Sequence, residues 1–295
     1  MRIGELIFRC LFAYGTLRPL AQPDDFGFAI CPPRRSSQHL TPSPCGNPPP
    51  LRVRSVVGRI ATRAPAYRSK NSGALRQDWP RIPLPNSKEL LLASAELGRQ
   101  IAALLDTEKP FSVAAPRPAG APITPVGTSA LQLIAVPSGV GGGALRDHEL
   151  AVTVGWGHAG KGGVCMPGKG RMVERDYTPI EREAVAAIYD RRTSDGERSS
   201  PLQLLGPRTC DVFLNDVDYW SNIPIRVWEY TIGGYQVIKK WLSYREEKLL
   251  ARPLTKDEVR YVQEIACRIA AILLLEPALN ANYRNVKEHA YTWTG

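Results

Sequence analysis

Long apolar runs are absent from this 295-residue chain. The longest, residues 269–275, spans seven positions, whereas a helix that crosses a bilayer needs about 20. Glu5 and Arg9 interrupt the apolar start of the chain, and no small-residue cleavage site follows it, so a secretory signal is not predicted. We therefore expect a cytoplasmic protein that makes no membrane contact.

The cysteines include no CxxC or CxxH pair. The six lie apart, at Cys10, Cys31, Cys45, Cys165, Cys210 and Cys267. Such spacing argues against a zinc finger and a disulfide framework, and indicates reduced, intracellular thiols. His148 and His158 lie near Cys165 in the sequence, but their spacing fits no common ligand set. We predict ordinary hydrogen-bonded histidines and no metal ion.

Nucleotide-binding motifs are also missing, since the chain holds neither GxxxxGK[ST] nor a glycine-rich adenosylmethionine loop after a buried strand. Residues 155–160 (GWGHAG) match GxGxxG, but a dinucleotide site also needs a helix that opens at the third glycine. The glycines and the proline that follow disfavour such a helix. The motif instead predicts a glycine-rich loop carrying Lys161 and Lys169, either as a plain turn or as a phosphate-contacting loop, and both interpretations stay open.

Catalytic signatures are equally scarce. Residues 47–50 (NPPP) approach the [DN]PP[YFW] motif of amino-methyltransferases, but the last position lacks the aromatic ring that stacks on a flipped base. Asp211, Asp216 and Asp218 could be nuclease carboxylates, yet such a cluster around Asn215 more often marks a strand end and a turn. We predict no catalytic residues in the chain.

Positive charge is concentrated in the first quarter of the chain. Residues 1–80 hold 12 Lys/Arg against 4 Asp/Glu and 11 of the 26 prolines, whereas residues 81–295 hold 26 basic against 24 acidic side chains. The net charge of +10 is therefore no evidence for a basic face on the folded part. Residues 1–64, rich in proline and arginine, are predicted to be disordered.

Hydrophobic periodicity predicts short strands between helices. We expect a helix over residues 87–105 capped by Asn86, a helix starting at Thr178 with a capping box, a helix from the box at Thr255 to residue 275 that stops before Pro277, and a further helix over residues 235–249. The expected strands are residues 131–136, 150–154, 171–177, 211–214 and 224–230. This order predicts an α+β fold, with mixed short strands, flanking helices and a helical C-terminus.

Residues 228–246 (WEYTIGGYQVIKKWLSYRE) interleave aromatic and basic side chains more densely than any other part of the chain. Trp241 belongs to a stripe at helical spacing, which indicates a core residue. The same helix would turn four polar side chains outward: Gln236, Lys239, Lys240 and Ser243. Lysine and serine suit phosphate contacts and glutamine suits an adenine edge, so a solvated face and a DNA-facing one are equally compatible with the pattern.

Several long motifs resemble the C-terminal specificity domain of Type ISP restriction–modification enzymes. They are residues 227–245 (VWEYTIGGYQVIKKWLSYR), 252–255 (RPLT) and 268–283 (RIAAILLLEPALNANY), with 78–85 (DWPRIPLP) and 95–99 (AELGR) resembling the junction into that domain. The resemblance covers roughly residues 65–283 and leaves residues 284–295 as a tail.

The resemblance implies a module that recognises an asymmetric sequence in double-stranded DNA. In the family, a nuclease, a helicase-like ATPase and an N6-adenine methyltransferase precede it, and these imply S-adenosylmethionine, ATP and Mg²⁺. No motif here matches those modules, so no cofactor is expected in this chain. The proline/arginine-rich residues 1–64 stand where the methyltransferase should end, which suggests a truncated or frame-disrupted gene copy, or a misassigned start.

The expected DNA contacts are His158, Lys161 and Lys169 in the glycine/lysine loop and Gln236, Lys239, Lys240 and Ser243 on the helix. An inactive gene remnant, or a scaffold that only docks to methyltransferase and helicase modules supplied separately, is the alternative. An autonomous enzyme using residues 155–160 is strongly disfavoured.

Overall fold

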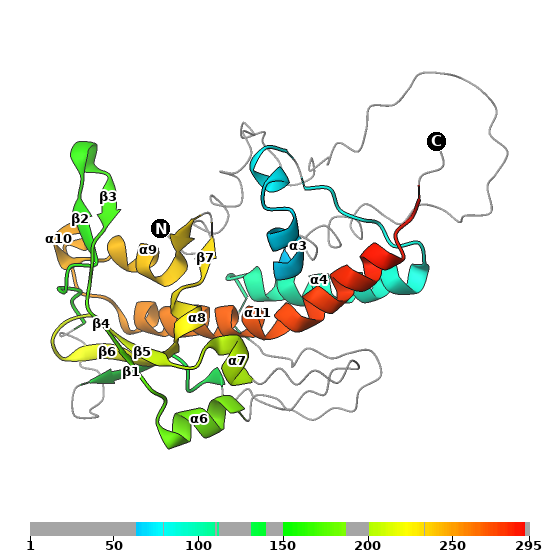
Figure 1. The fold of residues 1–295 in the computed structure, drawn as a ribbon. Helices are drawn as coiled ribbons and strands as arrows, with labels where there is room; N and C mark the ends of the chain where they lie inside the picture. The colour runs from blue at the N-terminus through cyan, green and yellow to red at the C-terminus, as the bar shows by residue number, and fades with distance from the viewer. Residues whose placement is uncertain are drawn as a thin grey trace.

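The computed structural model describes residues 63–78, 80–109, 111, 131–139, 150–186, 201–232 and 234–292. Small antiparallel sheets pack with helices, which confirms the predicted α+β class (Figure 1). In chain order the elements are α3 (Pro65–Lys70), η1 (Ala74–Arg76), α4 (Lys88–Leu105), β1 (Val136–Gly139), β2 (Gly157–Ala159), η2 (Lys161–Gly163), β3 (Cys165–Pro167), β4 (Met172–Arg175), α6 (Pro179–Ala186), α7 (Pro201–Leu205), β5 (Thr209–Phe213), β6 (Asp218–Pro224), α8 (Ile225–Trp228), β7 (Thr231–Ile232), β8 (Tyr235–Gln236), α9 (Val237–Ser243), α10 (Glu247–Leu250) and α11 (Lys256–Glu288).

Helix α11 is the central element, against which α3, α4, α7, α8, α9 and the largest sheet pack (Figure 1). It begins at the predicted capping box, where Thr255 Oγ1 accepts from the Glu258 N–H at 3.2 Å and the Glu258 carboxylate accepts from the Thr255 N–H at 3.0 Å. The predicted end before Pro277 is wrong, because the helix continues to Glu288 and into the predicted tail. An interior proline costs about 3 kcal/mol. Burial of Leu279, Tyr283 and Val286 beyond it offsets that penalty, at roughly 1.5–3 kcal/mol per large apolar side chain.

The largest sheet is antiparallel, in the order β1-β6-β5-β4. Its buried face lies against the first half of α11, and the buried Trp220 donates from Nε1 to the Val259 carbonyl at 3.2 Å. The carboxylate cluster lies in and around the β5–β6 turn, where Asn215 Oδ1 accepts from the Val217 and Asp218 N–H groups. The interpretation of this cluster as a strand end and turn is confirmed.

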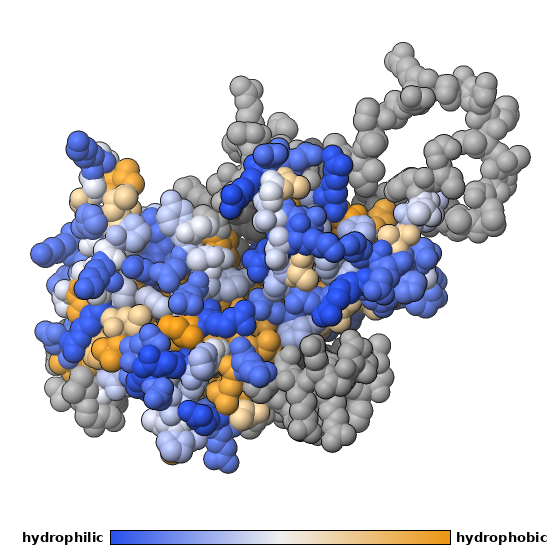
Figure 2. Space-filling model, viewed as in Figure 1, coloured by the Kyte–Doolittle hydropathy of each residue, from blue (hydrophilic) through white to orange (hydrophobic). Residues whose placement is uncertain are grey.

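Two hydrophobic clusters share α11. The larger includes residues of the sheet, α8, α9 and the first part of α11, and the smaller includes residues of α3, α4 and the second part of α11. In the space-filling view, hydrophilic residues surround scattered hydrophobic ones on the visible face (Figure 2). The fold thus presents β2, β3 and α9 on one side of a helix that is buried along much of its length.

The predicted helices match better than the predicted strands. The predicted helix α4 and the predicted start of α6 are confirmed. The N-cap of α4 is Ser87, one residue after the predicted Asn86. The predicted helix over residues 235–249 is interrupted between α9 and α10, where Glu246 forms a parallel bridge with Val152.

Two of the predicted strands, 171–177 and 211–214, correspond to β4 and β5. Residues 131–136 are mainly a turn that precedes β1, and residues 150–154 contribute a single bridge. The prediction of a strand at 224–230 is wrong, because β6 ends at Pro224 and α8 follows. That helical turn directs Arg226 to the Leu204 carbonyl and the Glu276 carboxylate, at 2.6 and 2.7 Å.

Arg175 connects β4 to α6 and β5, and its removal gives a testable prediction. Its guanidinium donates to Glu181 at 2.7 and 2.8 Å and to Asp211 at 2.8 and 3.0 Å. Arg175→Leu leaves both partly buried carboxylates without this partner, so we expect the free energy of unfolding to fall by about 2–3 kcal/mol. Urea denaturation measures it.

A pH titration of stability tests the same cluster. Burial opposes the charge of Glu181, but hydrogen bonds from Arg175 and Thr178 outweigh it and hold the pKa of Glu181 below its ordinary value. This contribution is present above the unfolded-state pKa of about 4.3 and is lost as pH falls through the lower, folded-state pKa. Arg175→Leu should reduce the acid dependence. Arg208→Leu, which removes exposed pairs with Glu174 and Asp176, is the control and should cost under about 1 kcal/mol. An equal effect of both variants would contradict the prediction.

Candidate nucleic-acid interface

The β2–β3 hairpin projects from the molecule on the same side of α11 as α9 (Figure 1). Its register pairs His158 with Met166, and the η2 turn joins the two strands. His158 and Lys161 are exposed on the hairpin, and Lys169, two residues after the end of β3, is exposed too. The structure therefore places the three residues predicted for the glycine/lysine loop on or beside one projecting ribbon.

Two glycines of the 155–160 motif meet backbone requirements at the base of this hairpin. A Cβ on Gly157 would lie 1.9 Å from the Ser243 carbonyl oxygen, and Gly155 has a φ of +80°. After Gly160 the chain forms the three-residue 3₁₀ turn η2, where Gly162 and Gly163 have left-handed φ values, and no α-helix opens there. The arrangement that a dinucleotide site requires is thus excluded here.

Several buried interactions fix the hairpin base. The buried Glu246 carboxylate accepts from the Gly155 and Trp156 N–H groups at 3.0 and 2.7 Å. Trp156 donates from Nε1 to the Phe213 carbonyl at 2.7 Å, and the Cys165 thiol donates to the Ser243 carbonyl at 2.9 Å. The ribbon is therefore anchored to the sheet, to α9 and to the start of α10.

Helix α9 corrects two predictions. Lys240 and Ser243, expected to face outward, are buried. The Lys240 ammonium lies 5.1 and 4.7 Å from the ring centroids of Tyr235 and Tyr244, and Ser243 Oγ donates to the Lys240 carbonyl at 2.7 Å. Both residues lie where β3 packs against α9, so they stabilise this contact and do not face solvent.

The predictions for Gln236, Lys239 and Trp241 agree with the structure to different degrees. Gln236, in β8 just before α9, and Lys239 are half-buried, so part of each side chain reaches the surface. Trp241 is buried, which confirms its interpretation as a core residue. Only Gln236 and Lys239 of the four polar side chains thus stay available for contact beside the hairpin.

The hairpin region carries positive charge without acidic residues. From Leu150 to Val173 the sequence contains Lys161, Lys169 and Arg171, but no aspartate or glutamate. Arg171 pairs at 3.1 Å with the exposed Asp216, which lies in the β5–β6 turn. Residues 81–295 are nearly neutral as a whole, whereas Lys161 and Lys169 make the projecting hairpin locally basic.

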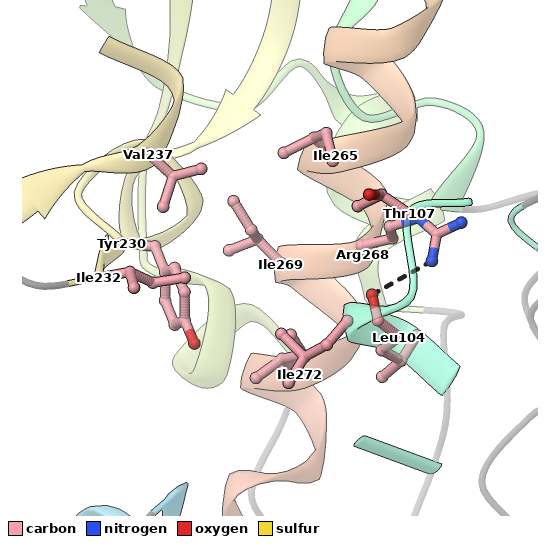
Figure 3. A pocket seen from close by; sticks show the side chains of 10 residues that line it. Leu104, Thr107, Tyr230, Ile232, Val237, Ile265, Arg268, Ile269 and Ile272 are labelled. Atoms are coloured by element: carbon pink, nitrogen blue, oxygen red, sulfur yellow. Dashed lines mark hydrogen bonds between the residues drawn. The ribbon is translucent and has the colours of Figure 1, made fainter. Parts of the chain in front are cut away.

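A small hollow lies between the end of α4, the segment around Tyr230 and α11 (Figure 3). Ile265, Ile269 and Ile272 of α11 line it, and Arg268 at its margin donates to the Leu104 carbonyl at 3.2 Å. Its volume of about 20 Å³ accommodates roughly one water molecule. A nucleotide or adenosylmethionine does not fit.

Other candidates from the sequence can be placed only in part. Within the described residues, no three His, Cys, Asp or Glu side chains gather as a metal site, and no helix has the length and apolar character needed to cross a bilayer. His148 lies outside the described residues, as do residues 1–62, which include the 47–50 motif.

Sequence reasoning missed two features of the hairpin. The exposed apolar side chains of Val164 and Met166 were not singled out, although strand alternation from the inward-facing Cys165 predicts an outward Met166. Glu246 accepts hydrogen bonds from two backbone N–H groups about 90 positions away, and no pattern in the sequence around Glu246 predicts this.

Comparison with known proteins identifies a family. The family model "Type ISP C-terminal specificity domain" matches residues 61–269, more than half of the chain. No curated protein and no solved structure matches.

Proposed function

The chain belongs to the Type ISP C-terminal specificity domain family, and we propose that it recognises a specific sequence in double-stranded DNA for a restriction–modification system. Family membership is the observation that carries this proposal. The projecting hairpin adds independent support, because it is basic, free of acidic residues and anchored at its base. Such a surface suits the phosphate backbone, which dominates protein–DNA affinity.

In this proposal the chain has no catalytic role of its own and directs N6-adenine methylation and restriction by other modules. S-adenosylmethionine, ATP and Mg²⁺ would be bound by those methyltransferase and helicase modules. Two places among the described residues support this division of roles. A Cβ on Gly157 would lie 1.9 Å from the Ser243 carbonyl oxygen, and the hollow beside Arg268 accommodates roughly one water molecule. The domain would position the methyltransferase over its adenine.

The proposed DNA contacts are His158, Lys161 and Lys169 on the hairpin and, beside them, Gln236 and Lys239. Lysine ammonium groups suit phosphates, whereas histidine and glutamine can hydrogen-bond to base edges. Lys240 and Ser243 do not belong to this set, because they are buried where β3 packs against α9.

Salt-dependent binding of the full chain to duplex DNA tests this function. We expect one preferred sequence and a linear fall of log K with log salt. Each of Lys161→Ala and Lys169→Ala should reduce the magnitude of that slope by about 1, because one phosphate contact is lost. Fluorescence anisotropy at several salt concentrations measures it.

Lys88→Ala is the matched control, since Lys88 is exposed at the start of α4. It should leave the slope unchanged. Negligible binding by a well-folded chain, without sequence preference, would contradict DNA recognition and favour a docking scaffold or an inactive remnant. Binding of adenosylmethionine by the chain alone would contradict the assignment of that cofactor to other modules.

A further inference from the structure

Two large apolar side chains are exposed on the hairpin. Val164 is 59% exposed and Met166 is 47% exposed, and hydrophobic and hydrophilic residues adjoin at the hairpin tip (Figure 2). The inward-facing Cys165 already supplies the contact with α9 through its bond to Ser243. Val164 and Met166 therefore contribute little to the core and are available to a partner.

Backbone contacts close the turn that carries these side chains. Gly160 donates from its N–H to the Val164 carbonyl at 2.8 Å, which closes the turn around η2. A Cβ on Gly160 would lie 2.9 Å from Met166 Cγ, so the methionine side chain lies across the glycine. His158 is the cross-strand neighbour of Met166. One edge of the ribbon thus combines a methionine, a valine and an imidazole, with Lys161 in the turn.

The hairpin base keeps this edge in place before any partner binds. Glu246, Trp156 and the close approach of Gly157 to Ser243 fix β2 to the body, and the Cys165–Ser243 hydrogen bond fixes β3. A pre-organised ribbon avoids much of the ordering entropy that a mobile loop would lose on binding.

Charge and shape favour DNA as the occupant. No acidic residue lies between Leu150 and Val173, whereas Lys161 and Lys169 flank the apolar edge. The major groove, about 12 Å wide, admits a two-stranded β-ribbon. Within that groove the thymine C5-methyl group is the apolar feature that an aliphatic side chain can contact.

We propose that the β2–β3 hairpin enters the major groove and that Val164 and Met166 contact thymine methyl groups of the recognised sequence. This inference rests on the proposed function and names how the same hairpin discriminates bases. Lys161 and Lys169 contact the flanking phosphates, and the apolar pair selects thymine over cytosine or uracil.

Replacement of thymine by deoxyuridine tests the proposal, because it removes only the methyl group. The full chain first selects its preferred duplex from a random library, and each thymine of that duplex is then replaced in turn. At one or two positions we expect affinity to fall about fourfold, as for loss of one buried methyl or methylene group. The double variant Val164→Ala/Met166→Ala should bind the thymine and deoxyuridine duplexes equally.

Val217→Ala, which truncates an exposed valine in the β5–β6 turn, is the control and should keep the deoxyuridine penalty. If the chain selects no duplex, the proposed function itself fails. If it selects a duplex but no deoxyuridine substitution matters, or the double variant keeps the penalty, the thymine contact is overturned while DNA recognition stands. A double variant with unchanged DNA binding but weakened association with a methyltransferase module would instead identify the edge as a protein-docking surface and overturn the proposal.

Discussion

Replacing Gly157 with alanine is expected to detach the β2–β3 hairpin from α9. The added Cβ would lie 1.9 Å from the Ser243 carbonyl oxygen and 2.7 Å from its carbonyl carbon. Both atoms belong to the backbone, so no side-chain rotation relieves the overlap and the two segments must separate. Overpacking of this kind costs about 1–3 kcal/mol when side chains can yield, and we expect at least the upper value here. Hydrogen exchange at residues 155–170 should accelerate.

Separation would also break the Cys165–Ser243 hydrogen bond and loosen the Glu246 contacts beside it. DNA affinity should therefore fall by more than for any single lysine substitution, because the whole ribbon loses its fixed position. Gly73→Ala is the control, since its φ of −67° is ordinary and no atom lies within 4 Å of the added Cβ. Unchanged exchange protection in Gly157→Ala would contradict this account of the hairpin base.

Local signals in the sequence predict helix starts well and helix ends poorly. Thr178 and Thr255 both form the capping boxes that their spacing predicts, because such boxes close within one turn of helix. Pro277 is a local stop signal, yet α11 passes it, since apolar residues on both sides are buried against α3 and α4. That burial depends on segments about 200 positions away, which helical periodicity does not show.

The candidate site illustrates the same limit. The loop lysines were found because glycine-rich loops are exposed whatever the fold, and Lys161 and Lys169 are indeed exposed. Periodicity predicts one buried and one solvent-facing side for α9, but β3 covers part of the second side and buries Lys240 and Ser243. A short helix between two packed neighbours has less free surface than its own pattern predicts.

Arg268 is expected to be the most important single side chain for the joint between α4 and α11. It is 3% exposed, and its guanidinium donates to the carbonyls of Ala103, Leu104 and Asp106 at 3.3, 3.2 and 2.9 Å. It also donates to Glu264 at 2.6 Å. The last turn of α4 holds no basic residue of its own, so Arg268 supplies both the donors and the positive charge that a helix C-terminus favours.

Arg268→Met keeps much of the side-chain volume but removes every donor. The Glu264 carboxylate and the last carbonyls of α4 then lose a buried partner, so we expect the free energy of unfolding to fall by about 3–5 kcal/mol. The free energy of unfolding of Arg268→Lys should lie between those of Arg268→Met and the unchanged protein. One ammonium group cannot reach Glu264 and the α4 carbonyls with the same fork geometry. Urea denaturation of the full chain measures both.

Arg260→Met is the control, since Arg260 lies on the same helix in an exposed pair with Asp257 and should change stability by less than about 0.5 kcal/mol. If Arg268→Met lowered the free energy of unfolding by less than about 1 kcal/mol, the proposed role of Arg268 in joining α4 to α11 would be wrong. Because Arg268 binds the end of α4 and not the sheet, its loss should expose α4 amides to exchange before those of the sheet. If the amides of α4 and of the sheet exchanged at the same rate in Arg268→Met, the two hydrophobic clusters would unfold as one unit. The predicted local loosening of α4 would then be wrong.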